Sequence, residues 1–267
     1  MKNLSKILII VLFLVMYANL EAKALRIVSI SPSITEIIFA LGGESNLVGV
    51  TSSCDYPKRA RNLPSIGDFA TPNLEKIVAL KPDLVIGMGN PGSSKNFLLQ
   101  KMGIKTIVLN SPNNFQDIYK IICEIGLVLD KQAKAKNLVN NLKYSVCKYK
   151  VNPNFKSKSV IILIWQQPLM AVSNKSFVSE IVEAAGFKNL LKTKTHFPVI
   201  SKEFLYAANP DYIILAEPRI KNFFIEANTF ANLKAVKNKH VIYKINTDWL
   251  LRPGPRFVNA IKQLQEQ

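Results

Sequence analysis

The sequence predicts an α/β protein of two lobes, each with a central parallel sheet, joined by one long rigid helix. Apolar runs rich in Val and Ile alternate with segments of helical spacing, which is typical of parallel sheets covered by helices. The alternation stops at residues 131–149 and then starts again. The segment LEKIVALKPDLVI at residues 74–86 has a second version, KEFLYAANPDYII, at residues 202–214. Each lobe therefore carries one copy of the same pattern.

Residues 1–24 have the pattern of an export signal. Two lysines accompany an apolar run over residues 7–17, and small residues follow at Ala22 and Ala24. The run is about half of the roughly 20 residues that a membrane-spanning helix needs. No cysteine follows it where a lipid anchor would be attached. We expect a signal peptide cleaved after Ala22 or Ala24 and a soluble protein in the periplasm, with an uncleaved anchor as the alternative.

Strands and helices alternate through residues 25–130, which form the expected N-terminal lobe. After the first strand, Ser33 and Glu36 have the spacing of a capping box, and Gly42 ends the helix that follows. The expected strands cover residues 26–31, 47–51, 84–89 and 105–109, and the expected helices cover residues 37–42, 74–81, 97–103 and 115–129.

A longer amphipathic helix interrupts the alternation. Ala135, Val139 and Leu142 lie at helical spacing with lysines and asparagines between them, which predicts a connecting helix at residues 131–150. The C-terminal lobe then occupies residues 151–267. Its expected strands cover residues 159–165, 211–216 and 241–245, and its expected helices cover residues 177–185, 203–208 and 256–264.

The repeated segment begins with a helix whose first turn is acidic in both copies. Asn73 and Ser201 are expected to cap these helices, so that Glu75 and Glu203 lie where the helix dipole favours a carboxylate. In the first copy the apolar residues share one face of the helix, so Glu75 is expected to face solvent. Acidic residues are common in the first turns of helices, so one such glutamate alone does not indicate a function. A matched pair, one on each lobe, favours a function.

The segment TDWLLRPGPR, residues 247–256, follows the last expected strand as a loop stiffened by two prolines. Loops at the carboxyl ends of parallel strands are where α/β proteins bind ligands. Asp248, Trp249 and Arg252 could grip an amphipathic molecule there. An internal ion pair between Asp248 and Arg252 is the equally supported alternative.

Large apolar side chains follow the strands of both lobes. Each alone is a core candidate, but their comparable positions suggest a cleft lined by flat apolar groups. They are Tyr56, Phe69, Met88, Trp165, Met170, Phe197 and Trp249.

The net charge is +17, and +15 remains after the expected signal is removed. A basic protein can bind nucleic acid, an anionic membrane or an anionic ligand. The lysines are scattered, however, which favours an evenly solvated surface, and export argues against nucleic acid.

No enzyme, metal or cofactor site is indicated. The sequence has no G-x-S-x-G elbow, no phosphate-binding glycine loop and no histidine beside a nucleophile. His196 and His240 lack surrounding acidic residues. Cys123 and Cys147 fall on neighbouring expected helices and could form a disulfide or remain buried free thiols.

Four stretches together resemble a known family. SISPSITEIIFALG, VGVTSSCDYP, NLEKIVALKPDLVIG and TDWLLRPGPRF resemble, in this order, the periplasmic binding proteins of ABC importers for vitamin B12, siderophores and haem. The likeness covers residues 25–267 and is strongest to the vitamin B12-binding members. It implies the class III fold of such proteins, in which a monomer holds its ligand between two lobes.

The resemblance also implies site residues. The glutamates aligned with Glu75 and Glu203 dock onto arginines of a dimeric permease in that family. Three of the ligand-facing positions depart from the vitamin B12 pattern, since Ser53 replaces a tyrosine and Phe69 and Met88 replace tryptophans. The positions that face the ligand are Ser53, Phe69, Met88, Phe197, Asp248, Trp249 and Arg252.

The leading hypothesis is a non-enzymatic protein that captures cobalamin and delivers it to an ABC importer. Asp248 and Arg252 would bind the ligand's polar edge, and Phe69, Trp165 and Phe197 would pack on its flat face. The thinner aromatic lining leaves a ferric siderophore or haem open as the ligand, and the basic charge mildly favours an anionic one. An exported α/β hydrolase is the remote alternative.

Overall fold

The structure is a computed structural model that describes residues 24–89, 94–149, 151–226 and 228–267. Apart from Ala24, the expected signal peptide lies outside the described residues. Within these ranges, no helix combines the length and the hydrophobicity that crossing a membrane requires.

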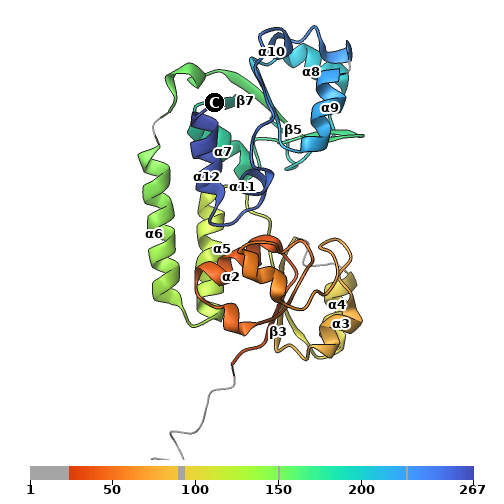
Figure 1. The fold of residues 1–267 in the computed structure, drawn as a ribbon, viewed down its shortest axis with the longest axis vertical. Coiled ribbons are helices and arrows are strands. Elements are labelled where there is room, and N and C mark those ends of the chain that lie inside the picture. The colour runs from red at the N-terminus through yellow and green to blue at the C-terminus, as the bar shows by residue number, and fades with distance from the viewer. Residues whose placement is uncertain (1–23, 90–93, 150, 227) are drawn as a thin grey trace, which may run out of the picture.

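The chain folds into two α/β lobes, with the long helix α6 running along one side of the molecule (Figure 1). The first lobe has a parallel sheet in the order β2-β1-β3-β4. Its strands are β1 (Ile27–Ser29), β2 (Leu47–Val50), β3 (Leu84–Met88) and β4 (Lys105–Leu109). All four lie where the alternating pattern predicts them.

The second lobe has a mixed sheet in the order β6-β5-β8-β9, with β7 also paired to β5. Strand β6 is antiparallel to β5, whereas β7 and β8 are parallel to it. The short β6 and β7 were not predicted, and the strand expected at 241–245 is reduced to two residues. The strands are β5 (Ser159–Gln166), β6 (Leu169–Ala171), β7 (Lys188–Asn189), β8 (Tyr212–Leu215) and β9 (Val241–Ile242).

Helices cover both sheets and connect the lobes. In the first lobe they are α2 (Pro32–Ala40), α3 (Leu74–Ala79), α4 (Ser94–Lys101) and α5 (Phe115–Val128), followed by α6 (Gln132–Lys148). In the second lobe they are α7 (Phe177–Ala185), α8 (Lys202–Ala208), α9 (Pro218–Glu226), α10 (Lys234–Lys237), α11 (Thr247–Leu251) and α12 (Phe257–Gln265). Short 3-10 helices are η1 (Glu44–Asn46), η2 (Lys58–Asn62), η3 (Pro153–Phe155) and η4 (Asn228–Phe230).

Local signals set several helix ends as predicted. The side chain of Asn73 caps α3, and that of Ser201 caps α8, each accepting a hydrogen bond from a backbone N–H of the first turn. Helix α7 ends at Gly186, whose φ of 115° is accessible to glycine at little cost. These ends depend on residues next to them in the chain.

One hydrophobic core runs through both lobes. Alternate residues of each strand point to opposite faces of the sheet, and one face of each sheet contributes to this shared core. Helix α6 packs against α5 and α12, and α12 also packs against α7. The ring of Phe115 on α5 stacks on that of Phe257 on α12 at 4.5 Å between centroids. The lobes are therefore joined by packed helices as well as by the chain between them.

The cysteines correct one expectation. Cys123 on α5 and Cys147 on α6 are free, and both are exposed, so neither alternative considered from the sequence is correct. Cys54 is the buried free thiol, where hydroxyl groups of Thr35 and Thr51 lie 3.2 and 3.1 Å from its sulfur.

Candidate ligand-binding cleft

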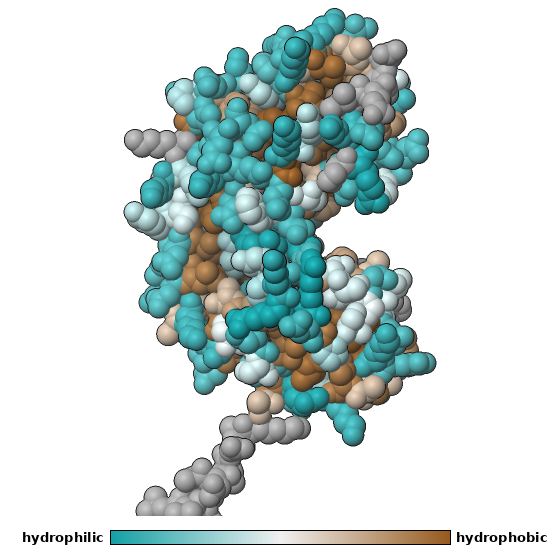
Figure 2. All heavy atoms as spheres, in the orientation of Figure 1, coloured by the Kyte–Doolittle hydropathy of each residue, from teal (hydrophilic) through white to brown (hydrophobic). Residues whose placement is uncertain are grey.

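A cavity of about 450 Å³ lies between the lobes, on the side where Figure 2 shows a deep notch. Ser31, Met88 and Ser111 reach it at or just after the carboxyl ends of β1, β3 and β4, the usual ligand position in α/β proteins. The second lobe supplies the opposite wall. The lining residues are Ser31, Pro32, Ser33, Ser53, Phe69, Met88, Gly89, Ser111, Pro112, Ser176, Phe177, His196, Phe197, Leu251, Arg252 and Pro253.

The lining is apolar with scattered hydroxyl groups. Phe69 and Met88 from the first lobe and Phe177 and Phe197 from the second supply flat or soft apolar surface, and five serines supply hydroxyls. Among the lining residues that the structure describes, Arg252 alone has a permanently charged side chain. The volume of the cavity is within the range of about 300–1,000 Å³ that small-molecule sites have.

Five of the eight expected ligand residues meet at this cavity, and three do not. Those that line it are Ser53, Phe69, Met88, Phe197 and Arg252. Trp165, Asp248 and Trp249 are not among the lining residues.

Trp165 lies near the end of β5 and is engaged elsewhere. Its indole N–H donates to the carbonyl of Gln167 at 2.9 Å, and the guanidinium of Arg219 lies 5.0 Å from the ring centroid. This cation–π contact holds the ring outside the cavity lining.

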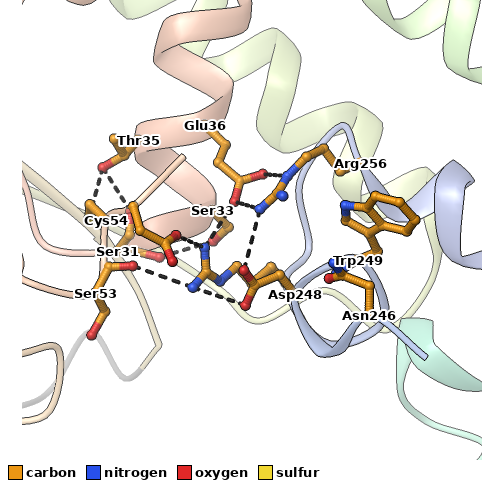
Figure 3. A network of polar contacts seen from close by, with 12 residues as sticks. Ser31, Ser33, Thr35, Glu36, Ser53, Cys54, Asn246, Asp248, Trp249 and Arg256 are labelled. Carbon is orange, nitrogen blue, oxygen red and sulfur yellow. Dashed lines mark hydrogen bonds and ion pairs between the residues drawn. The ribbon is translucent and has the colours of Figure 1, made fainter. Parts of the chain in front are cut away.

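The segment 247–256 is partly helical, which corrects the expected loop. The Asn246 side chain caps the one-turn helix α11 by accepting the N–H of Trp249 at 3.1 Å. Trp249 lies beside Asn246 on this turn, apart from the charged groups (Figure 3). The chain then passes through Arg252 to α12.

Arg252 lines the cavity with most of its donors already engaged. Its guanidinium lies 2.6 Å from an oxygen of Asp55 and 3.0 Å from one of Asp248, and it reaches the carbonyl of Ser53 at 3.4 Å. The expected ion pair with Asp248 is therefore present, while the role of Arg252 in binding a ligand stays a prediction.

The pairing of Arg252 with Asp55 changes the pKa of both groups. Burial opposes ionisation of Asp55, but the hydrogen bond and charge of Arg252 outweigh it and lower the pKa of Asp55. Burial likewise disfavours the charged form of Arg252, but the bond to Asp55 and the nearby carboxylates raise its pKa. Both groups are charged at neutral pH, and the positive charge on the cavity wall is compensated.

Glu36 joins the same network from α2, and the expected capping box is wrong. Helix α2 begins after Ser31 and has no side-chain cap, so Ser33 and Glu36 lie inside it. The carboxylate of Glu36 is buried and receives a two-pronged contact from Arg256 of the second lobe (Figure 3). A pair separated by 220 residues has replaced the local bond that the spacing suggested.

Glu75 and Glu203 are both exposed in the first turns of α3 and α8. In the view of Figure 1 these helices lie on the side of the molecule away from α6. Hydrogen bonds from its own backbone N–H and from Ser201 lower the pKa of Glu203, which keeps it ionised. Each copy of the repeated segment therefore presents its glutamate to solvent.

Sequence reasoning missed several lining residues. Ser31 is the last residue of one expected strand and Ser111 lies two residues after another, so the rule that ligands bind at strand ends would have found them. His196 and Ser176 lie far from any predicted strand end, and only the fold brings them to the cavity. The Nε2 of His196 lies 2.8 Å from the side-chain oxygen of Asn113, which belongs to the other lobe.

Comparison with known proteins gives consistent matches over most of the chain. The family of periplasmic binding proteins matches residues 27–244. An uncharacterized ABC transporter substrate-binding lipoprotein of Bacillus subtilis is 30% identical over 93% of this chain and 81% of its own length. A vitamin B12-binding protein of Vibrio parahaemolyticus is 29% identical over 90% of this chain and 88% of its own length.

A solved structure matches the whole two-lobed arrangement. It is a possible iron-binding periplasmic solute-binding protein from Staphylococcus epidermidis, with a TM-score of 0.78 and 28% identity over 90% of this chain and 97% of that one. The predicted fold class is confirmed, and the family consists of non-enzymatic transport components. The chain belongs to the periplasmic binding protein family.

Proposed function

We propose that this protein is the extracytoplasmic substrate-binding protein of an ABC importer and that it captures cobalamin in the cleft between its lobes. The general role is supported by the family and by the relatives named above. The choice of cobalamin is supported by the vitamin B12-binding relatives and by the chemistry of the cleft.

The observation that carries the ligand proposal is the compensated charge of Arg252. A multiply charged anion would need unpaired cations in the cleft, because a charge removed from water must be paired. Arg252 is already paired with Asp55 and Asp248. The serine hydroxyls and apolar rings suit an uncharged molecule with many amide groups, as a corrinoid is. A corrinoid is larger than the cavity, so part of it would project from the cleft.

Delivery would use the two exposed glutamates. Glu75 and Glu203 lie one on each lobe, outside the cleft, so a permease of two subunits could hold both lobes at once. Exposed charges of this kind guide association and orientation more than they add affinity. The protein would dock as a monomer while its ligand remains in the cleft.

Haem is the second candidate, because two possible iron ligands line the cavity. His196 and Met88 come from opposite lobes, and imidazole and thioether groups are both used as haem ligands. The iron-binding description of the Staphylococcus epidermidis protein points in the same direction. Haem carries two carboxylates, however, and the cleft has no uncompensated arginine among its described lining residues.

Titration of the protein lacking residues 1–24 distinguishes the ligands. Cyanocobalamin, haemin and a ferric siderophore are each added while tryptophan fluorescence and visible absorbance are recorded. Saturable binding of cyanocobalamin alone is expected. A haemin complex with a sharp Soret band and no corrinoid binding would replace cobalamin with haem, and binding of none would refute the ligand proposal.

Variants of the lining give the matched control. Phe69→Ala and Phe197→Ala each remove a partly exposed ring from the cavity wall and are expected to weaken corrinoid binding. Tyr144→Ala removes a ring of similar size from the exposed surface of α6 and is expected to leave binding unchanged.

A further inference from the structure

Glu36 is a buried carboxylate that the proposed function does not use. Its side chain is 2% exposed, and it does not line the cavity. Its partners Arg252 and Arg256 bound the segment 252–256, which we call the strap, between α11 and α12. Glu36 therefore links α2 of the first lobe to the strap of the second.

The contacts between Glu36 and the strap are numerous and directional. The Nε and Nη2 atoms of Arg256 donate to the two carboxylate oxygens, and the Nε bond is 2.8 Å long. The Nη1 atom of Arg252 lies 3.3 Å from the same carboxylate. The guanidinium of Arg256 also lies 3.9 Å from the centroid of the Tyr56 ring, so it is held by the first lobe on a second side.

The backbone of the strap also lies close to α2. A methyl group added at Gly254 would come 3.3 Å from the Oε2 atom of Glu36 and 3.8 Å from the carbonyl oxygen of Ser33. A glycine allows this approach because it has no Cβ. The strap and the first turn of α2 together form one wall of the cavity through Ser33, Arg252 and Pro253.

The charges explain why the carboxylate matters. Arg252 and Arg256 have side chains that are only 19% and 14% exposed, and Glu36 is the most buried of the carboxylates near them. Removing its charge would leave Arg256 without its main partner, since Asp248 lies 3.9 Å away. Poorly compensated guanidinium groups are expected to move toward water and carry the strap with them.

We propose that Glu36 is a positioning residue for the cleft: it holds the strap against α2 and so places Arg252 and Pro253 in the cavity wall. Its influence on the ligand is indirect, through Arg252, and that part of the proposal rests on the proposed function. The effect on the strap itself does not.

Glu36→Gln tests the strap without any ligand. Hydrogen–deuterium exchange of peptides covering residues 247–256 is expected to become faster while peptides from β3 and β8 are unchanged. Glu44→Gln is the matched control, because Glu44 pairs with Arg59 at 2.8 Å within the first lobe and its loss is expected to leave the strap unchanged.

The same variant tests the indirect effect on binding. Cyanocobalamin affinity is expected to fall about tenfold in Glu36→Gln, and Glu36→Asp, which keeps the carboxylate, is expected to bind more tightly than Glu36→Gln. Equal weakening by both variants would indicate a loss of packing alone and would overturn the role of the charge. If the unaltered protein binds no cyanocobalamin, the proposed ligand is wrong, and the exchange experiment still decides the role of Glu36.

Gly254→Ala keeps the proposal falsifiable if Glu36→Gln does not fold. The added methyl group would lie 3.3 Å from the Oε2 atom of Glu36, so the carboxylate and the strap must separate slightly with no change of charge, and faster exchange at residues 247–256 is expected. Unchanged exchange in a folded Glu36→Gln protein, or in Gly254→Ala where the first variant does not fold, would overturn the proposal.

Discussion

The repeated segment is built in the same way in both lobes, but its aspartate is anchored differently. In each copy a capped helix is followed by a residue with left-handed backbone directly before the proline, Lys81 (φ 46°) or Asn209 (φ 36°). In each copy, the aspartate after the proline accepts a hydrogen bond from a backbone N–H at the start of the first strand of its lobe. Asp83 accepts that of Arg26, and Asp211 accepts that of Ser159, both at 2.9 Å.

In the second copy a hydroxyl group and a charged group also bind the aspartate. Asp211 also accepts the hydroxyl of Ser159 at 2.7 Å and pairs with the ammonium of Lys234. The caps and the aspartates therefore have a structural explanation in both lobes. Glu75 and Glu203 lie in the first turns of their helices but form no salt bridge within the described parts of the chain. The comparison separates scaffold from candidate function within one short pattern.

The largest expected effect comes from reversing both glutamates. Glu75→Lys together with Glu203→Lys is expected to reduce uptake to less than about a tenth, because like charges placed opposite each other cost several kcal/mol. Ligand affinity should be unchanged, since neither residue lines the cavity. Transport of labelled ligand and solution titration measure the two separately. Unaltered transport by the double variant would contradict the docking role, and unequal single variants would show that the two copies are not equivalent.

The ion pair of the second copy should contribute to stability. Asp211→Asn is expected to lower the free energy of unfolding by about 2 kcal/mol, because an amide cannot replace the ion pair with Lys234. Urea unfolding measures the loss, and Asp83→Asn in the first copy gives the comparison between the lobes. An Asp211→Asn protein as stable as the unaltered one would contradict the role of the ion pair.

The contribution of Asp211 should also depend on pH. The bonds from Lys234 and from Ser159 lower the pKa of Asp211 from its ordinary value of 3.8. A carboxylate whose pKa is lowered by folding stabilises the protein above its unfolded pKa, and this contribution is lost as the pH falls. The difference in unfolding free energy between the unaltered protein and Asp211→Asn should therefore be full at pH 7 and shrink below 3.8. If this difference in unfolding free energy did not depend on pH, the negative charge of Asp211 would not be what stabilises the folded protein.

The helix caps should give the smallest and most similar effects. Asn73→Ala and Ser201→Ala each remove an oxygen that accepts an N–H of the first turn, and each is expected to cost about 1 kcal/mol. Asn73→Ser and Ser201→Asn exchange one good cap for another and serve as controls. Thermal unfolding measures all four, and a cost confined to one lobe would show that the two helices contribute unequally.

Elements with strong local signals were predicted closely. Helix α7 has the expected bounds because Ser176 and Gly186 mark its two ends, and β4 has the expected bounds because a short apolar run defines it. Strands β6 and β7 and helix α11 were not predicted. They have two to five residues, so contacts with the rest of the fold rather than intrinsic preference decide them.

The candidate cleft shows the same division. Ser53, Phe69, Met88, Phe197 and Arg252 are ligand-facing positions that the resemblance implies, and the structure brings them to one cavity. Trp165 has the right residue type and a strand-end position, but Arg219 lies over its ring and it stays outside the lining. A side chain's direction depends on its neighbours in space, which the sequence does not list.

The sequence by itself determined the two α/β lobes, the helix between them and the repeated capped helix, because these follow from the spacing of apolar residues and from caps that act within three or four positions. Only the tertiary structure decided the role of Glu36. Its spacing from Ser33 suggests a helix cap, whereas the fold buries it against Arg256, 220 residues away. A buried charge must find its partner in space, and the folded chain alone determines which groups are near enough to pair.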